Sequence, residues 1–225
     1  MDNVAKAFNG YANEYDRWFE TLEGRVLFEM EVEAVRLLMK GLEKPFLEIG
    51  VGTGRFAKEL GIDFGIDPSH MMLERAMKRG IKVKKAEGEK LPFKENSFGG
   101  VFIVFTLCFV DEPGKVLSEA KRVLKHGGGL IVGIINREST WGSLYMKKGD
   151  EGHPIYKHAR FYNAGEVTEM LKKTGFTVDA YSSTLCQPPS AQAFKEDAHA
   201  ALLKEAGFIC IRASKPRLEI KNYEE

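Results

Sequence analysis

The chain has 225 residues, a hydrophobic fraction of 44%, a charged fraction of 29% and a formal net charge of +1. This near-neutral charge argues against a nucleic-acid partner, because such a partner usually requires a basic stripe. No apolar run approaches the roughly 20 residues of a membrane helix, and the N-terminus lacks the apolar core of a signal peptide. We therefore expect a cytoplasmic protein without a membrane partner. The cysteines lack metal-ligand spacing, so no metal site is predicted.

The first 40 residues precede the expected sheet and are predicted to form an N-terminal helical cap (residues 1–40). Residues 8–19 are rich in aromatic side chains, and residues 25–39 place apolar side chains on one helical face. Strands and helices then alternate. Strands are predicted at 46–49, 64–66, 81–85, 101–105 and 130–135, and helices at 55–60, 69–78 and 114–124. Repeated alternation predicts an α/β fold with a parallel sheet and right-handed crossovers.

The last third of the chain follows a different pattern. Residues 136–162 carry tryptophan, tyrosine and phenylalanine without a clear period, and we interpret them as a substrate lid inserted in the domain. The elements predicted after them are a helix at 164–174, a strand at 176–182, a polar linker at 186–200, a helix at 198–205 and a strand at 208–213. No domain boundary is evident, so residues 1–225 are predicted to form one domain.

The most specific motif is the run FLEIGVGTGRF from Phe46 to Phe56. Glycine permits a positive φ and lets a ligand approach the main chain, so Gly50, Gly52 and Gly54 indicate a nucleotide-like ligand. A dinucleotide fingerprint would place a small residue at Arg55, and a Walker A loop would end in Lys-Ser or Lys-Thr. Glu48 would repel a pyrophosphate but suits a ligand with an ammonium and a cationic sulfur. The alternative is a plain tight turn.

Three further positions extend this site. Asp67 ends the second strand, where a carboxylate can accept hydrogen bonds from both ribose hydroxyls. Met72 can pack against an adenine face or belong to the core. After the third strand, Glu87 and Gly88 can recognise the adenine edge, or they form a solvated acidic loop.

Together these motifs resemble the class I S-adenosylmethionine-dependent methyltransferases, in particular the small-molecule branch that includes the ubiquinone and menaquinone methyltransferases. The resemblance rests on residues 46–54, 65–69 with Met72, 91–98 and 107–128. The last of these ranges is similar to a segment of the family that ends in two glycines. It covers roughly residues 44–135. It implies a Rossmann-like, mostly parallel seven-stranded sheet of order 3-2-1-4-5-7-6, with strand 7 antiparallel and helices on both faces.

The resemblance also implies the cofactor S-adenosyl-L-methionine and a set of residues that contact it. Glu48 and the backbone of residues 50–54 would face its methionine part, and Asp67 would bind the ribose. The other implied cofactor contacts are Pro68, Met72, Glu87 and Gly88 around the adenine, Phe105 and Thr106 near the methyl group, and Tyr15 closing over the site.

The sequence says less about the methyl acceptor, because methyl transfer chiefly needs positioning of the acceptor and exclusion of water, and not a particular catalytic group. No catalytic residue is assigned; His126, His153 and His158 are candidates by chemistry alone. Aromatic side chains in 136–162 would suit an amine acceptor, since aromatic faces attract cations.

The stretch 105–108 lacks the Asn-Pro-Pro-Tyr/Phe motif of nucleic-acid methyltransferases. We predict methyl transfer to a small molecule. The alternatives are an NAD(P)-binding oxidoreductase and a non-catalytic S-adenosylmethionine-binding protein.

Overall fold

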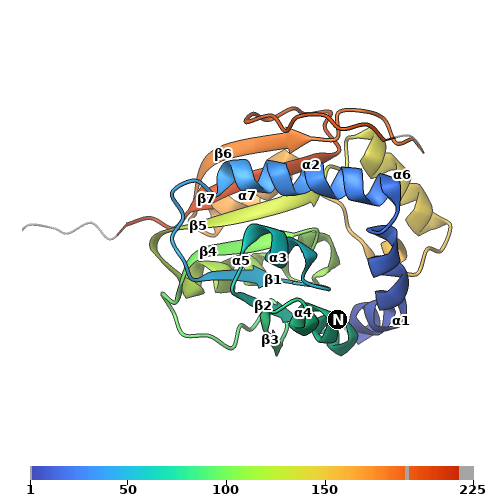
Figure 1. Cartoon of the computed structure of the whole chain (residues 1–225). Helices are drawn as coiled ribbons and strands as arrows, with labels where there is room; N and C mark the ends of the chain where they lie inside the picture. The colour runs from blue at the N-terminus through green and yellow to red at the C-terminus, as the bar shows by residue number, and fades with distance from the viewer. Residues whose placement is uncertain (1, 191–192, 218–225) are drawn as a thin grey trace, which may run out of the picture.

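The computed structural model of the chain describes residues 2–190 and 193–217 (Figure 1). Residue 1 of the predicted cap, residues 191–192 of the predicted linker and residues 218–225 of the predicted domain lie outside the described residues. The helices are α1 (Asp2–Trp18), α2 (Leu22–Leu38), α3 (Arg55–Leu60), α4 (His70–Lys78), α5 (Pro113–Val123), α6 (Thr140–Asp150) and α7 (Ala164–Lys173), with short 3-10 turns η1 (Leu107–Phe109) and η2 (Tyr156–His158). The strands are β1 (Phe46–Ile49), β2 (Phe64–Asp67), β3 (Lys82–Lys85), β4 (Phe98–Val104), β5 (Leu124–Ile135), β6 (Thr177–Thr184) and β7 (Phe208–Ser214).

The strands form one seven-stranded sheet in the order β3-β2-β1-β4-β5-β7-β6. The pairs from β3 to β5 are parallel, whereas β7 runs antiparallel to both β5 and β6. The predicted strand order and the antiparallel strand 7 are therefore confirmed. The parallel strands β1 and β4 are buried along their whole length, as expected for strands covered on both faces.

Each face of the sheet has its own hydrophobic core. On one face, α2, α3 and α4 pack against Phe102, Ile131 and Phe208. On the other, α5 and α7 cover Val101, Leu130 and their neighbours. At the end of the sheet toward which β1 and β5 point, α1 and α6 stand close together (Figure 1). This arrangement leaves the carboxyl ends of the parallel strands beneath two helices that are not part of either layer.

The segment 136–162 is more regular than its sequence suggests. Its first part forms α6, which begins at the N-cap Ser139, whose hydroxyl accepts a hydrogen bond from the Gly142 N–H at 2.9 Å. Glycines at 142 and 149 weaken the intrinsic helix signal. Gly142 is nevertheless needed, because a Cβ there would lie 2.2 Å from the Asn136 carbonyl oxygen. The helix forms because Trp141 is buried and Tyr145 is partly buried against the rest of the molecule.

Two other predictions need correction. The helix predicted at 198–205 is absent, because His199 pairs with Ser183 in an antiparallel bridge that extends the chain there, with backbone hydrogen bonds of 2.8 and 2.9 Å. Strand β5 begins at Leu124 rather than at residue 130, since Leu124 pairs with Phe98 of β4 before the glycines.

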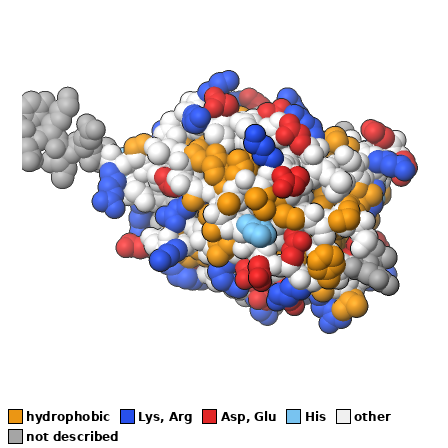
Figure 2. Space-filling model, turned by 90° about the horizontal axis from the view of Figure 1, so that it is seen from above, with side chains coloured by type: hydrophobic (Ala, Val, Ile, Leu, Met, Phe, Trp, Pro, Cys, Tyr) orange, Lys and Arg blue, Asp and Glu red, His pale blue; other side chains and the backbone are white. Residues whose placement is uncertain are grey.

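The surface is mixed in charge. On the face drawn in Figure 2, cationic and anionic side chains of the described residues are interspersed. None of the helices within 2–190 and 193–217 combines the length and apolar character needed to cross a bilayer.

Candidate functional site

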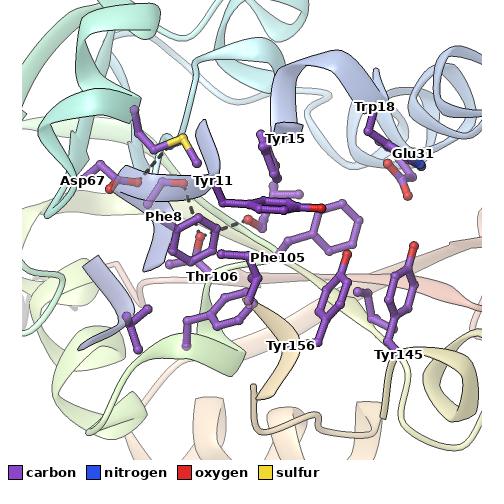
Figure 3. A pocket seen from close by; sticks show the side chains of 18 of the residues that line it. Phe8, Tyr11, Tyr15, Trp18, Glu31, Asp67, Phe105, Thr106, Tyr145 and Tyr156 are labelled. Atoms are coloured by element: carbon purple, nitrogen blue, oxygen red, sulfur yellow. Dashed lines mark hydrogen bonds between the residues drawn. The ribbon is translucent and has the colours of Figure 1, made fainter. Parts of the chain in front are cut away.

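A cavity of about 250 Å³ opens at the carboxyl ends of the parallel strands, between the sheet, α1 and α6. One half is bordered by the glycine loop and by the ends of β2 and β4. The other half is bordered by aromatic side chains from α1, α6 and η2 (Figure 3). An open parallel sheet is expected to bind its ligand at this edge.

The glycine loop forms the floor of the first half. Gly50 has a φ of +73°, and a Cβ there would lie 2.3 Å from the Thr106 side chain, so only glycine fits. Gly52 has a φ of +51°, and a Cβ at this position would have no neighbour within 4 Å. The backbone of Gly52 is therefore open to the cavity. Gly54 does not line the cavity; it begins α3 and packs against Ala76.

Asp67 organises the loop and also borders the cavity. Its Oδ2 accepts a hydrogen bond from the Gly52 N–H at 3.0 Å, and its Oδ1 accepts one from the Ser69 N–H at 2.8 Å. Burial raises the pKa of Asp67 to about 6, although these two hydrogen bonds oppose the rise. Pro68 and Met72 line the cavity next to it. Met72 is also fully buried in the protein. It therefore belongs to the core and also borders the cavity, so the two alternatives given for this side chain are compatible.

Two predicted acidic contacts lie away from the cavity. Glu48 is 2% exposed, and its Oε2 has no hydrogen-bond partner among the described residues. Burial and the nearby charge of Asp67 raise its pKa well above the ordinary value, and the Ala57 N–H of α3 partly offsets this. Glu87 is exposed and borders a separate depression with Lys6. Gly88, in contrast, is buried and lines the cavity.

The end of β4 forms the wall between the two halves. Phe105 has a φ of +54°, a strained value for a residue with a side chain. Its N–H donates to the Gly133 carbonyl at 2.9 Å, and its ring lies 4.8 Å from that of Phe208. The Thr106 hydroxyl donates to the Val104 carbonyl at 3.0 Å and lies 3.3 Å from that of Gly50. Both predicted residues line the cavity.

Helix α1 covers the glycine-loop half through polar contacts. The Asn9 side-chain oxygen accepts hydrogen bonds from the Ser69 hydroxyl at 2.7 Å and from the Met71 N–H at 3.2 Å. Asp16 pairs with Arg55 at 2.8 Å and with Arg79 at 2.9 Å. The predicted contact residue Tyr15 lines the cavity from this helix, and burial raises its pKa, with a smaller contribution from Glu31.

The second half is an aromatic chamber, which we define by Tyr15, Trp18, Trp141, Tyr145 and Tyr156. The Tyr145 and Tyr156 rings lie 4.6 Å apart between centroids. In Figure 3 their hydroxyl ends point toward the side of the chamber where Glu31 and Trp18 lie.

The histidine candidates differ in position. His153 lines the cavity, and its Nε2 lies 3.4 Å from the Tyr11 hydroxyl. Burial lowers the pKa of His153, and the charge of Lys148 lowers it further. His158 is not among the lining residues. His126 lies on an exposed part of β5, with its Nδ1 3.2 Å from the Pro216 carbonyl oxygen.

Sequence reasoning missed Glu31, which lines the chamber although it is only 6% exposed. The available signal was a charged residue on the apolar face of the 25–39 helix, between Leu27 and Ala34. A buried carboxylate at such a position is uncommon unless it has a partner.

The residues present fit the expected S-adenosylmethionine. Gly52 leaves open space against its backbone, and the Asp67 carboxylate borders the cavity at the end of β2, with lone pairs left for ribose hydroxyls. Apolar side chains that line the same cavity as Gly88, including Val4 and Phe109, provide surfaces for a flat base.

Comparisons with known proteins agree with this geometry. Residues 47–132 match the family model described as "Methyltransferase domain". The crystal structure of an S-adenosylmethionine-dependent methyltransferase from Thermotoga maritima, described as a possible histamine N-methyltransferase, is 41% identical, with a TM-score of 0.87. The match covers 94% of this chain and 99% of that one.

Two curated relatives extend the comparison. A Methanocaldococcus jannaschii protein described as uncharacterized is 49% identical over 75% of this chain and 80% of its own length. A demethylmenaquinone methyltransferase from Renibacterium salmoninarum is 34% identical over 58% of each chain. These findings do not favour an NAD(P)-binding oxidoreductase or a non-catalytic binding protein.

Motif, topology, cavity and relatives therefore agree: the chain belongs to the class I S-adenosylmethionine-dependent methyltransferases, and its cofactor is S-adenosyl-L-methionine.

Proposed function

We propose that this enzyme transfers the methyl group of S-adenosylmethionine to a small-molecule amine bound in the aromatic chamber. The observation that carries the proposal is the continuity of the cavity, which joins the glycine loop to the chamber. A concave chamber between α1 and α6 suits a small acceptor better than a polymer.

The cofactor would lie in the glycine-loop half. Asp67 would accept hydrogen bonds from the ribose hydroxyls, and Gly50 and Gly52 would lie against the methionine part. Pro68, Met72 and Gly88 would border the adenine, while Phe105, Thr106 and Tyr15 would surround the methyl group. Glu48 would act from beneath the loop, since it does not line the cavity. Glu87 would reach the adenine edge only from the neighbouring depression.

When bound, S-adenosylmethionine supplies a methyl group on a cationic sulfur that departs as a neutral thioether. The chain must then hold the acceptor nitrogen in line with that methyl group and exclude water. We propose that α1 closes the cofactor half and that residues 136–162, which include α6 and η2, act as the lid of the acceptor half.

An amine acceptor is supported by the chemistry of the chamber. Aromatic faces attract cations, and the chamber combines tyrosine and tryptophan rings with the buried carboxyl of Glu31. The description of the Thermotoga maritima relative as a possible histamine N-methyltransferase points to the same acceptor class.

A screen for product tests the proposal. The purified protein is incubated with S-adenosylmethionine and one acceptor at a time from matched sets of amines, alcohols, phenols and thiols, with histamine among the amines. We expect release of S-adenosylhomocysteine and a mass gain of one methyl group with amines only. Turnover confined to phenols, alcohols or thiols would contradict the amine assignment. Binding of S-adenosylhomocysteine without turnover on any acceptor would favour a binding protein.

A further inference from the structure

Glu31 is the unusual charged group of the aromatic chamber. It lies on α2 in the buried stripe that includes Leu27, Met30 and Ala34. Its side chain makes no hydrogen bond or ion pair with the other described residues, yet it is 6% exposed and borders the cavity. A buried carboxylate without a partner is costly, so its presence on a cavity wall points to a ligand.

The groups around Glu31 favour one positive charge. Tyr15 from α1 and Tyr145 from α6 lie close enough for the Glu31 charge to raise the pKa of both phenols, although burial is the larger cause. Cys210 of β7 is affected in the same way. Tyr156 and His153 border the chamber from the segment after α6.

Lys148 of α6 is a cation that lines the same cavity. Its Nζ lies 5.2 Å from the centroid of the Tyr145 ring. It forms no ion pair with Glu31 among the described residues, so the carboxyl remains available to a ligand.

We propose that Glu31 is the residue that selects the acceptor, by pairing with a cationic ammonium group whose apolar body lies among the aromatic rings. This inference rests on the proposed function, and it adds the residue and the charge state that define the substrate class. The acceptor binds as a monocation with an apolar or aromatic body, held by one ion pair and by ring faces. Because an ammonium nitrogen has no lone pair, its proton passes to the Glu31 carboxylate before the nitrogen attacks the methyl carbon. The carbon–sulfur bond then breaks, and S-adenosylhomocysteine is the leaving group.

The protonation state of Glu31 provides a readout that is independent of turnover. Burial raises the pKa of Glu31 to about 8, so at pH 7 the ligand-free protein holds a proton on this carboxyl. A cation that pairs with Glu31 must expel that proton, because the ion pair requires the carboxylate. Binding of a cation at pH 7 therefore releases about one proton to the buffer.

The experiment measures binding of three matched probes to protein saturated with S-adenosylhomocysteine. Benzylamine and benzyltrimethylammonium are cations, whereas benzyl alcohol is neutral with a similar ring. Calorimetry in two buffers of different ionisation enthalpy gives both the affinity and the number of protons released. For the wild type we expect both cations to bind about tenfold or more tightly than benzyl alcohol, with proton release for the cations only.

Variants assign the effect to Glu31. Glu31→Gln should abolish both the preference for cations and the proton release, while benzyl alcohol binding stays within about twofold. Glu31→Asp should retain a preference for cations. Glu29→Gln is the matched control, because Glu29 lies on the same helix with an exposed side chain that pairs with Lys195. Binding of S-adenosylhomocysteine confirms that each variant is folded.

The outcomes separate this inference from the proposed function. If the wild type binds no probe, or prefers cations equally in Glu31→Gln, the assignment of Glu31 is overturned. In either case methyl transfer to amines in the acceptor screen would leave the proposed function standing. Conversely, probe binding with proton release but no turnover on any amine would support the cation site and overturn the proposed function.

Discussion

Asp67 illustrates how one side chain joins the fold to the site. Its two oxygens accept hydrogen bonds from the N–H groups of Gly52 and Ser69, which fixes the glycine loop relative to the N-terminus of α4. Each oxygen keeps a further lone pair. The carboxylate can therefore stabilise the loop and accept ribose hydroxyls at the same time.

Replacing Asp67 should weaken cofactor binding more than folding. For Asp67→Ala we expect the Kd for S-adenosylhomocysteine to rise about tenfold to a hundredfold, on the scale of lost hydrogen bonds to a charged group. Calorimetry at pH 7.5 measures this change. Asp197→Asn, on an exposed segment, serves as the control and should bind as the wild type does. An unchanged Kd in Asp67→Ala would exclude Asp67 from ribose binding.

The same carboxyl should make cofactor binding pH-dependent. The pKa of Asp67 lies at about 6, above its ordinary value, and the ionised form is the better acceptor for two hydroxyls. Affinity for S-adenosylhomocysteine should therefore be highest above about pH 7 and should decline as the pH falls from 7 to 5. The decline attributable to this residue should be absent in Asp67→Ala. A wild-type Kd that stays constant over this range would contradict the assignment.

A site residue could be predicted from the sequence where a local sequence pattern marks its position. The positions of Gly50, Gly52 and Asp67 on the cavity could be predicted, because they lie where strands end and the glycine spacing is specific. Gly54 was expected there too but packs against Ala76 instead. Glu31 could not be predicted, since its importance depends on α1 and α6, which meet α2 only in the folded molecule. Glu48 was recognised as special, but its placement beneath the loop rather than on the cavity needed the structure.

Among the elements, α1 is attached differently from the other long helices. Side chains of α2, α5 and α7 fill the cores on the two faces of the sheet, whereas Asn9 and Asp16 anchor α1 to the start of α3 and to the two ends of α4. Asp16 bonds to the guanidinium groups of Arg55 and Arg79, and these arginines hold its pKa below the usual range despite burial. Such polar anchoring suits the proposed role of α1 in closing the cofactor half.

Weakening this anchor should speed cofactor release. For Asp16→Asn we expect S-adenosylhomocysteine to dissociate about three- to tenfold faster, because two charge-assisted hydrogen bonds are weakened at a partly exposed site. Stopped-flow displacement measures the rate. Glu14→Gln is the control on the same helix, since Glu14 pairs only with its neighbour Arg17 among the described residues. Equal dissociation rates in wild type and Asp16→Asn would show that α1 does not control release.

The helices and strands that could be predicted each have a local sequence pattern that indicates them. The strands of the parallel sheet are short apolar runs, and α7 begins with a capping box formed by Asn163 and Glu166. Helix α6 could not be predicted, because its two glycines weaken the signal and because Trp141 packs against residues distant in the sequence. The false helix at 198–205 has helix-forming residues, but the bridge between His199 and Ser183 overrides their local preference.

For the molecule as a whole, the strand order was predicted from the resemblance to a family, since no local pattern specifies which strands are neighbours. The fold buries three carboxyl groups at or beside the cavity: Glu31 of α2, Glu48 of β1 and Asp67 of β2. All three have pKa values raised by burial. The folded protein therefore binds more protons than the unfolded chain over the neutral range, a property that belongs to the site rather than to any single element.

This proton uptake should make the ligand-free protein less stable as the pH rises. A carboxyl with a folded pKa above its unfolded value destabilises the fold once the unfolded chain can ionise it, so the free energy of unfolding should fall between pH 5 and pH 8. Each such group contributes at most about 1.4 kcal/mol per pH unit. Asp16, Asp63, Glu119 and Glu166 have lowered pKa values, so they act below this window.

Urea unfolding at pH 5.5, 7 and 8 measures how the free energy of unfolding changes with pH. His153 slightly offsets the expected fall, because the lowered pKa of this histidine adds stability as the pH rises through its ordinary value. Glu31→Gln should be less sensitive to pH than the wild type, most clearly between pH 6 and 8, because the pKa of Glu31 lies at about 8. Glu29→Gln should keep the wild-type slope. A wild type that is more stable at pH 8 than at pH 5.5 would mean that these carboxyls are solvated or paired in solution, and the chamber would then lose its preference for a cation.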